Sequence, residues 1–81
     1  MNKHKLFLKI KRGNNNVRFD DFKSLVETFG YRIIRINGSH HIFKHPNVPE
    51  FLNLQARNGQ VKPYQVREFL GYVEKYGLTM E

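Results

Sequence analysis

The chain has 81 residues, no cysteine and a formal net charge of +7, which results from 14 Lys and Arg against seven Asp and Glu. This length predicts one domain, residues 1–81. The lack of cysteine excludes disulfides and cysteine-ligated zinc. No apolar run approaches the ~20 residues of a membrane span. We therefore expect a cytoplasmic protein without a membrane partner, whose charge favours a polyanion such as nucleic acid, although an acidic protein would suit the same charge.

Residues 1–16 are predicted to form a basic helix and a loop in front of a core formed by residues 17–78. Three apolar side chains share one side of a helix over residues 3–11: Leu6, Phe7 and Ile10. Four lysines crowd the same segment and lower the intrinsic stability of the helix. Packing against the rest of the protein must therefore stabilise it.

Residues 19–31, FDDFKSLVETFGY, carry the clearest helical pattern. Apolar residues recur at positions i, i+3, i+4 and i+7, namely Phe22, Leu25, Val26 and Phe29. Asp20 or Asp21 is expected to cap the first turn, and Gly30 is expected to end the helix in a left-handed conformation.

From Tyr31 the period changes to two, and residues 31–37, YRIIRIN, predict a strand. Strict alternation would place Arg32, Ile34 and Ile36 on one face and Tyr31, Ile33 and Arg35 on the other. Asn37-Gly38 predicts a hairpin turn, because both residues tolerate positive φ.

Residues 40–45, HHIFKH, are the expected returning strand, which Pro46 ends because it cannot donate a ladder hydrogen bond. Residues 47–50, NVPE, predict a turn, and residues 51–56, FLNLQA, predict a third strand.

A last helix is expected to begin near Pro63 and to end at Gly77. Its apolar stripe consists of Val66, Phe69, Leu70, Val73 and Tyr76. Seven residues are expected to form the centre of the core: Leu25, Val26, Leu52, Leu54, Phe69, Leu70 and Val73.

The order helix, three antiparallel strands, helix predicts an α+β fold of the double-stranded-RNA-binding-domain-like plan, with an extra N-terminal helix. The two amphipathic helices must bury their apolar stripes, and one face of the sheet is the only large surface available. The other face of the sheet is expected to stay open.

The stretch NGSHHIFKHP, residues 37–46, concentrates three histidines beside a turn. Alternation along a strand places His40 and Lys44 on one face and His41 and His45 on the other, without deciding which face is buried. A metal site is disfavoured, because His41 and His45 lie about 13 Å apart along a strand at ~3.3 Å per residue.

Metal-independent RNA cleavage is a second interpretation. An imidazole with a pKa of about 6.5 can accept a proton from the ribose 2′-hydroxyl. Lys44 could stabilise the phosphate, and Gly38 and Ser39 at the turn could approach it closely. No general acid is evident, and the residues alone favour a third interpretation, ordinary exposed strand histidines.

The chain resembles the HicA family of toxin–antitoxin toxins over residues 17–78. The resemblance lies in Gly30-Tyr31, in Gly38-Ser39-His40 and in Phe43 with His45-Pro46. In place of the Pro-x-His segment and GTL-type helix start of many members, this chain has NLQARNGQVKPYQVREFL.

This resemblance implies cleavage of mRNA without metal or cofactor, with His40 as the catalytic histidine. It also implies a HicB-like antitoxin that blocks the active site, and contact with DNA only through that antitoxin. The residues expected to bind RNA are Arg35, Gly38, Ser39, Lys44 and Lys62. The competing hypotheses are an RNA-binding module without catalysis and a purely protein-binding adaptor.

Overall fold

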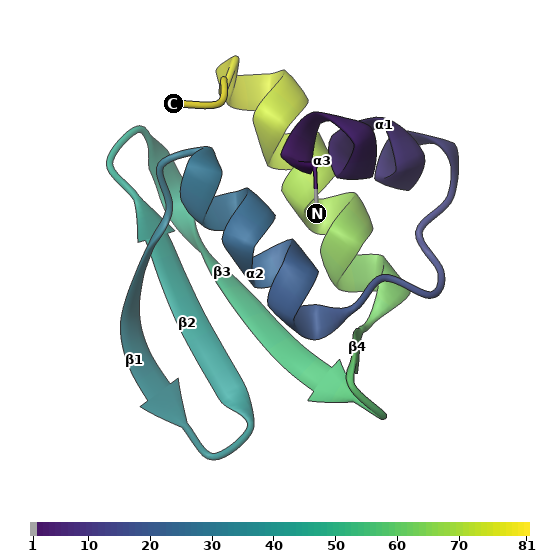
Figure 1. The fold of residues 1–81 in the computed structure, drawn as a ribbon. Helices are drawn as coiled ribbons and strands as arrows, with labels where there is room; N and C mark the ends of the chain where they lie inside the picture. Colours follow the sequence, from purple (N-terminus) through teal and green to yellow (C-terminus); the bar gives the residue numbers. More distant parts are fainter. Residues whose placement is uncertain (1) are drawn as a thin grey trace.

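The computed structural model describes residues 2–81, which form three helices and one four-stranded antiparallel sheet (Figure 1). The elements are α1 (Lys3–Arg12), α2 (Phe19–Thr28), β1 (Arg32–Asn37), β2 (His40–His45), β3 (Val48–Arg57), β4 (Gln60–Val61) and α3 (Pro63–Tyr76). The strands lie in the order β1-β2-β3-β4. The predicted α+β order is confirmed, and the short β4 is an addition to it. Within the described residues, no helix has the length and apolarity needed to cross a membrane.

The core lies between the sheet and the helices α2 and α3, which cover the same face of the sheet (Figure 1). The ring of Phe69 on α3 is at its centre, with its centroid 5.4 Å from that of Phe22 and 5.2 Å from that of Phe29. Leu52 and Leu54 of β3 are fully buried beneath these rings. The stripe predicted for α2 is confirmed, because each of its four residues is buried.

The N-terminal helix α1 packs on α2 and α3, as expected from its weak intrinsic stability. Leu6 and Ile10 are buried, and the Phe7 ring lies 5.0 Å from the ring of Phe29. The side chain of Asn2 accepts hydrogen bonds from two backbone N–H groups of the first turn and so caps the helix.

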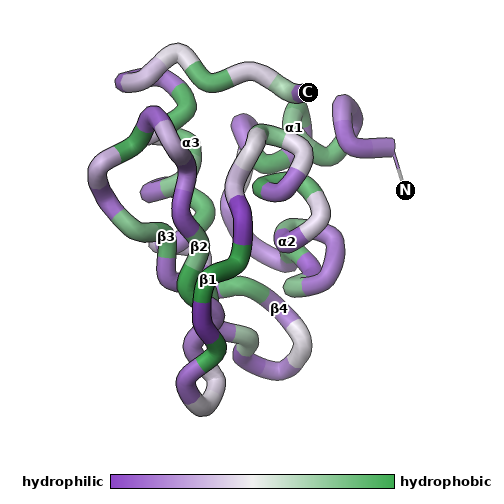
Figure 2. Tube along the Cα trace, turned by 90° about the vertical axis from the view of Figure 1, so that its left-hand side faces the viewer, coloured by the Kyte–Doolittle hydropathy of each residue, from purple (hydrophilic) through white to green (hydrophobic). Residues whose placement is uncertain are grey.

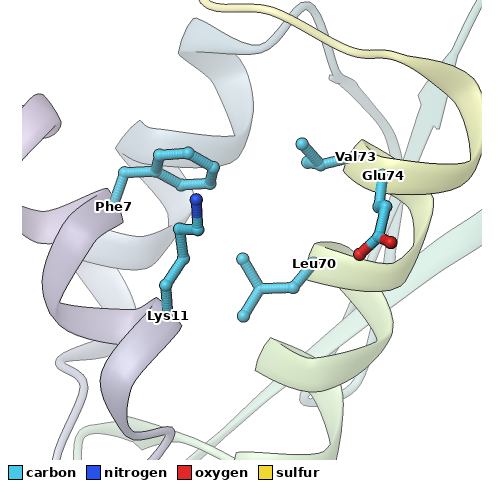
Figure 3. Close-up of a pocket in the computed structure, with 5 residues that line it drawn as sticks. All are labelled: Phe7, Lys11, Leu70, Val73 and Glu74. Carbon is cyan, nitrogen blue, oxygen red and sulfur yellow. The ribbon is translucent and has the colours of Figure 1, made fainter.

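The predicted core is correct for five residues and wrong for Leu70 and Val73, which are only partly buried. Both line an open groove between α1 and α3, and Figure 3 shows them across from Phe7 and Lys11. They are not fully covered because α1 is short and lies at an angle over α3.

The predicted helix ends at Gly30 and Gly77 are confirmed, whereas the predicted cap at the start of α2 is not. Gly30 and Gly77 have φ of 99° and 62°, as expected for residues that end helices. The predicted capping by Asp20 or Asp21 is wrong, because α2 begins after Arg18 and both carboxylates lie inside its first turn. There they still interact favourably with the positive end of the helix dipole.

The turns before and after β2 begin or end at other residues than predicted. Asn37 pairs with His40, so the β1–β2 turn consists of Gly38 and Ser39 rather than Asn37-Gly38. Gly38 alone has positive φ, which suits a turn with glycine at its first central position. The third strand begins at Val48, so that most of the predicted 47–50 turn belongs to β3.

A second Asn-Gly pair forms the turn between β3 and β4. Asn58 and Gly59 both have positive φ, 53° and 76°, and Arg57 pairs with Gln60 across them. This backbone pattern is the one that favours Asn-Gly in two-residue hairpins. No strand was predicted for residues 57–62, so β4 is an addition to the predicted elements.

Strand β1 contains a bulge that changes the predicted faces. Ile33 pairs with Phe43 but Arg35 pairs with Ile42, so Ile34 is the extra residue. Arg35 therefore faces away from the helices. Ile36, which pairs with His41, lies on the same side of the sheet as the helices. Strict alternation from Tyr31 was wrong beyond the bulge. Figure 2 shows the mixture of hydrophobic and hydrophilic residues along this strand, which is at the edge of the sheet.

Candidate functional site

The register of β2 against β3 determines which face His40 occupies. Phe43 is opposite Leu52, and both side chains are fully buried beneath the helices. His40 is opposite Gln55, and Ile42 is opposite Asn53, on the face that the helices leave uncovered. Directly paired residues of an antiparallel sheet point to the same side. His40 is thus a partly exposed side chain of the open face, next to the hairpin turn.

Two side-chain amides and one lysine hold the His40 ring. Its Nδ1 lies 3.2 Å from Oδ1 and 2.9 Å from Nδ2 of Asn53. Its Nε2 lies 3.1 Å from Nε2 of Gln55. The ammonium group of Lys62 donates a hydrogen bond of 3.0 Å to Oε1 of Gln55. We call these four residues the His40 network.

The donors in this network define the tautomer of neutral His40. Lys62 can only donate, so Oε1 of Gln55 is the acceptor and the amide NH2 group points at His40 Nε2. Nε2 must then accept and carry no proton. Although Asn53 Nδ2 is the nearer atom to Nδ1, a neutral imidazole accepts at only one nitrogen, so Nδ1–H donates to Asn53 Oδ1. The basic atom of His40 is therefore Nε2.

The other two histidines of β2 serve the structure. The His41 ring packs against Phe19, with centroids 4.9 Å apart. His45 is buried and bridges two backbone groups: its Nδ1 accepts from the N–H of Asn47, so its Nε2–H donates to the carbonyl of Phe29 at 3.0 Å. His45 is thus a neutral core histidine with the opposite tautomer to His40.

The residues expected to bind RNA lie either at the hairpin turn or on the open face of the sheet. Gly38 and Ser39 are exposed at the hairpin end, which extends past α2 in Figure 1. Lys62 belongs to the His40 network. Arg35 is on the open face because of the β1 bulge.

Lys44 shares the open face with His40 but lies at the other end of the strand, about 13 Å away at ~3.3 Å per residue. Its ammonium group donates to the carbonyl of Val48 and lies 5.5 Å from the centroid of the Phe51 ring. Lys62, rather than Lys44, is therefore the cation that hydrogen bonds link to the His40 imidazole, through the side chain of Gln55.

Sequence reasoning missed Asn53 and Gln55. The alternation Leu-Asn-Leu-Gln over residues 52–55 already predicted that both amides face away from the leucines. Only the pairing of β2 with β3 reveals that they lie next to His40.

Among residues 2–81, no three His, Asp or Glu side chains come together in a way that could hold a metal ion. The chemistry available on the open face is that of one imidazole, two amides and nearby cations.

The family model described as HicA toxin of bacterial toxin-antitoxin matches residues 19–74, which is more than half of the chain. The matched segment runs from the first residue of α2 into the last turns of α3 and includes the whole His40 network. Comparisons with curated proteins and with solved structures found no significant match.

Proposed function

The chain belongs to the HicA toxin family, and we propose that it is a metal-independent endoribonuclease that cleaves mRNA with His40 as its general base. As a member of this family it is a toxin of a toxin–antitoxin pair. The observation that supports the proposal best is the hydrogen bonding of His40, in which Nδ1 contacts Asn53 and Nε2 faces the Gln55 amide on the uncovered face of the sheet.

RNA supplies its own nucleophile, so the protein needs only to move a proton and to stabilise charge. His40 Nε2 takes the proton of a ribose 2′-hydroxyl, and the freed oxygen attacks the adjacent phosphorus. The bond from phosphorus to the 5′-oxygen breaks, and that oxygen takes a proton from water. The His40 imidazolium then returns its proton to the hydroxide so formed. The products are a 2′,3′-cyclic phosphate and a 5′-hydroxyl. Asn53 holds the ring and stabilises the imidazolium through Nδ1–H.

In the free protein the Gln55 amide occupies the lone pair of His40 Nε2. A phosphate is a stronger acceptor for an ammonium group than a neutral amide oxygen is. We expect an RNA phosphate to draw Lys62 away from Gln55, which leaves the Gln55 amide free to rotate and uncovers Nε2 for the 2′-hydroxyl. Lys62 then stabilises the charge that develops on the phosphate.

The remaining contacts serve to position the strand. Arg35 and Lys44 extend a positive surface along the open face, and Gly38 with Ser39 offers backbone N–H groups and a hydroxyl at the hairpin turn. These residues are proposed RNA contacts. Lys44→Ala should weaken cleavage more than Lys3→Ala, because Lys3 lies on α1, which packs on the helices.

We propose that a HicB-like antitoxin inhibits the toxin by covering the open face and His40. The net charge of +7 suits an acidic partner surface. The toxin would then contact DNA only through this antitoxin.

The test compares His40→Ala with His41→Ala on a labelled single-stranded RNA, using the purified chain with and without EDTA. His41 is the matched control, because it is the adjacent histidine on the opposite face of β2. We expect loss of cleavage in His40→Ala only, no effect of EDTA, and no cleavage where the 2′-hydroxyl is replaced by hydrogen. Continued cleavage by His40→Ala would refute the proposal, and RNA binding without cleavage by the wild type would favour a non-catalytic binding module.

A further inference from the structure

A second concave surface adjoins the His40 network at the end of the sheet. It has a volume of about 440 Å³ and lies between the β3–β4 turn and the first turn of α3. Its main lining residues are Arg57, Asn58, Gln60, Lys62, Pro63 and Tyr64. We call it the end pocket.

The charge of the end pocket favours an anion. Arg57 and Lys62 contribute two cations, and none of the lining residues, all of which the structure describes, is acidic. Arg57 lies two and four residues after Gln55 and Asn53 on β3, so alternation places it on the same open face as the His40 network. The positive surface is therefore continuous from His40 into the pocket.

Tyr64 offers an aromatic surface in the same pocket. Half of this residue is exposed to solvent. Its hydroxyl accepts a hydrogen bond of 3.2 Å from Nε2 of the buried Gln65, whose Oε1 accepts from the backbone N–H of Gln55 at 3.0 Å. These hydrogen bonds link the Tyr64 hydroxyl to the Gln55 backbone through Gln65.

Two separate connections therefore link the end pocket to His40. One runs through Lys62 and the Gln55 side chain, and the other runs from Tyr64 through Gln65 to the Gln55 backbone. A ligand in the end pocket would therefore be held at a defined position relative to a group that binds at His40 Nε2. A cation pair beside a fixed aromatic ring is the combination that binds a nucleotide, with the phosphate on the cations and the base on the ring.

We propose that the end pocket binds one nucleotide of single-stranded RNA, next to the nucleotide whose 2′-hydroxyl reaches His40. Its phosphate contacts Lys62 and Arg57, and its base stacks on Tyr64. The RNA must be single-stranded here, because a base inside a duplex has no free face for the ring. This inference rests on the proposed function for its substrate and adds the subsite that orients it.

The experiment measures binding of a labelled single-stranded RNA by fluorescence anisotropy, in the 81-residue His40→Ala chain so that the RNA stays intact. Replacing Tyr64 with Ala or Leu should weaken binding roughly 5- to 150-fold, the value expected for loss of one stacked base. Tyr64→Phe keeps the ring and should bind within about twofold of the parent. Circular dichroism of each variant checks that the fold is retained.

Two further arms test the nature of the ligand. Lys62→Ala should reduce the slope of log affinity against log salt by about one, whereas Lys3→Ala should leave it unchanged. Duplex RNA of the same sequence should bind equally to the Tyr64→Ala and Tyr64→Phe chains.

Equal binding of single-stranded RNA by the Tyr64→Ala and Tyr64→Phe chains would overturn the inference while leaving His40 catalysis intact. Loss of antitoxin binding but not of RNA binding in Tyr64→Ala would also overturn it, by assigning the pocket to the protein partner. Failure of the His40→Ala chain to bind single-stranded RNA at low salt would do the same. Since cleavage is not measured, failure of the proposed function is detected separately, by the comparison of His40→Ala with His41→Ala.

Discussion

Replacement of Gly30 by alanine should destabilise the protein through two separable effects. Gly30 has φ of 99°, and a Cβ at this position would lie 2.9 Å from Nε2 of His45 and 3.0 Å from Oε2 of Glu81. His45 Nε2 donates to the Phe29 carbonyl at 3.0 Å, so moving the ring would break a buried hydrogen bond. Glu81 is exposed and can move away.

The expected loss can be built from these two effects. A non-glycine residue at positive φ costs about 1–2 kcal/mol. A buried hydrogen bond that is broken without replacement costs about 1–3 kcal/mol. The Gly30→Ala loss is therefore about 2–5 kcal/mol, against a total of roughly 4–12 kcal/mol for a chain of this length.

Urea denaturation of three glycine variants separates the two effects. Gly59 has φ of 76° and nothing within 4 Å of an added Cβ, so Gly59→Ala should show only the backbone cost of about 1–2 kcal/mol. Gly71 lies within α3 with open space around it, and Gly71→Ala should stabilise by about 0.5–1 kcal/mol. If Gly30→Ala costs no more than Gly59→Ala, the inferred packing of His45 against Gly30 is wrong.

Two tyrosines lead to predictions about pH. The hydroxyl of Tyr31 is buried without a hydrogen-bond partner among residues 2–81, and burial raises its pKa well above the usual range. The folded state therefore keeps a proton that the unfolded state loses above about pH 10, so the free energy of unfolding falls as pH rises above that value. Tyr31→Phe should reduce this fall in urea titrations, without loss of stability at pH 7. The hydrogen bond from Tyr76, 2.7 Å long, lowers the pKa of Glu50. The stabilising effect of this hydrogen bond is present above the usual carboxyl pKa and is lost as pH falls through the lowered pKa of Glu50. The stability difference between wild type and Tyr76→Phe should therefore shrink in acid. A difference that persists unchanged at low pH would contradict this.

The sequence by itself determined the three helices, the first three strands and the alternation of side chains along β2. A period of 3.6 with glycine ends specified α2 and α3, and alternation over residues 40–45 correctly separated His40 and Lys44 from His41 and His45. These features depend on backbone preferences and on neighbours only a few residues away. Even so, the predicted Asn37-Gly38 turn was wrong by one residue, because strand pairing places Asn37 opposite His40 and leaves Gly38 and Ser39 as the turn.

Only the tertiary structure decided which face of the sheet is covered and what surrounds the imidazole. His40 lies on the open face because Phe43, Leu52 and Leu54 bury more apolar surface against the helices than Ile42 would. The register of β3 brought Asn53 and Gln55 to His40, and the bulge in β1 turned Arg35 to the same face. Register and packing depend on the sum of contacts between residues far apart in the chain, and no local pattern of residues contains that sum.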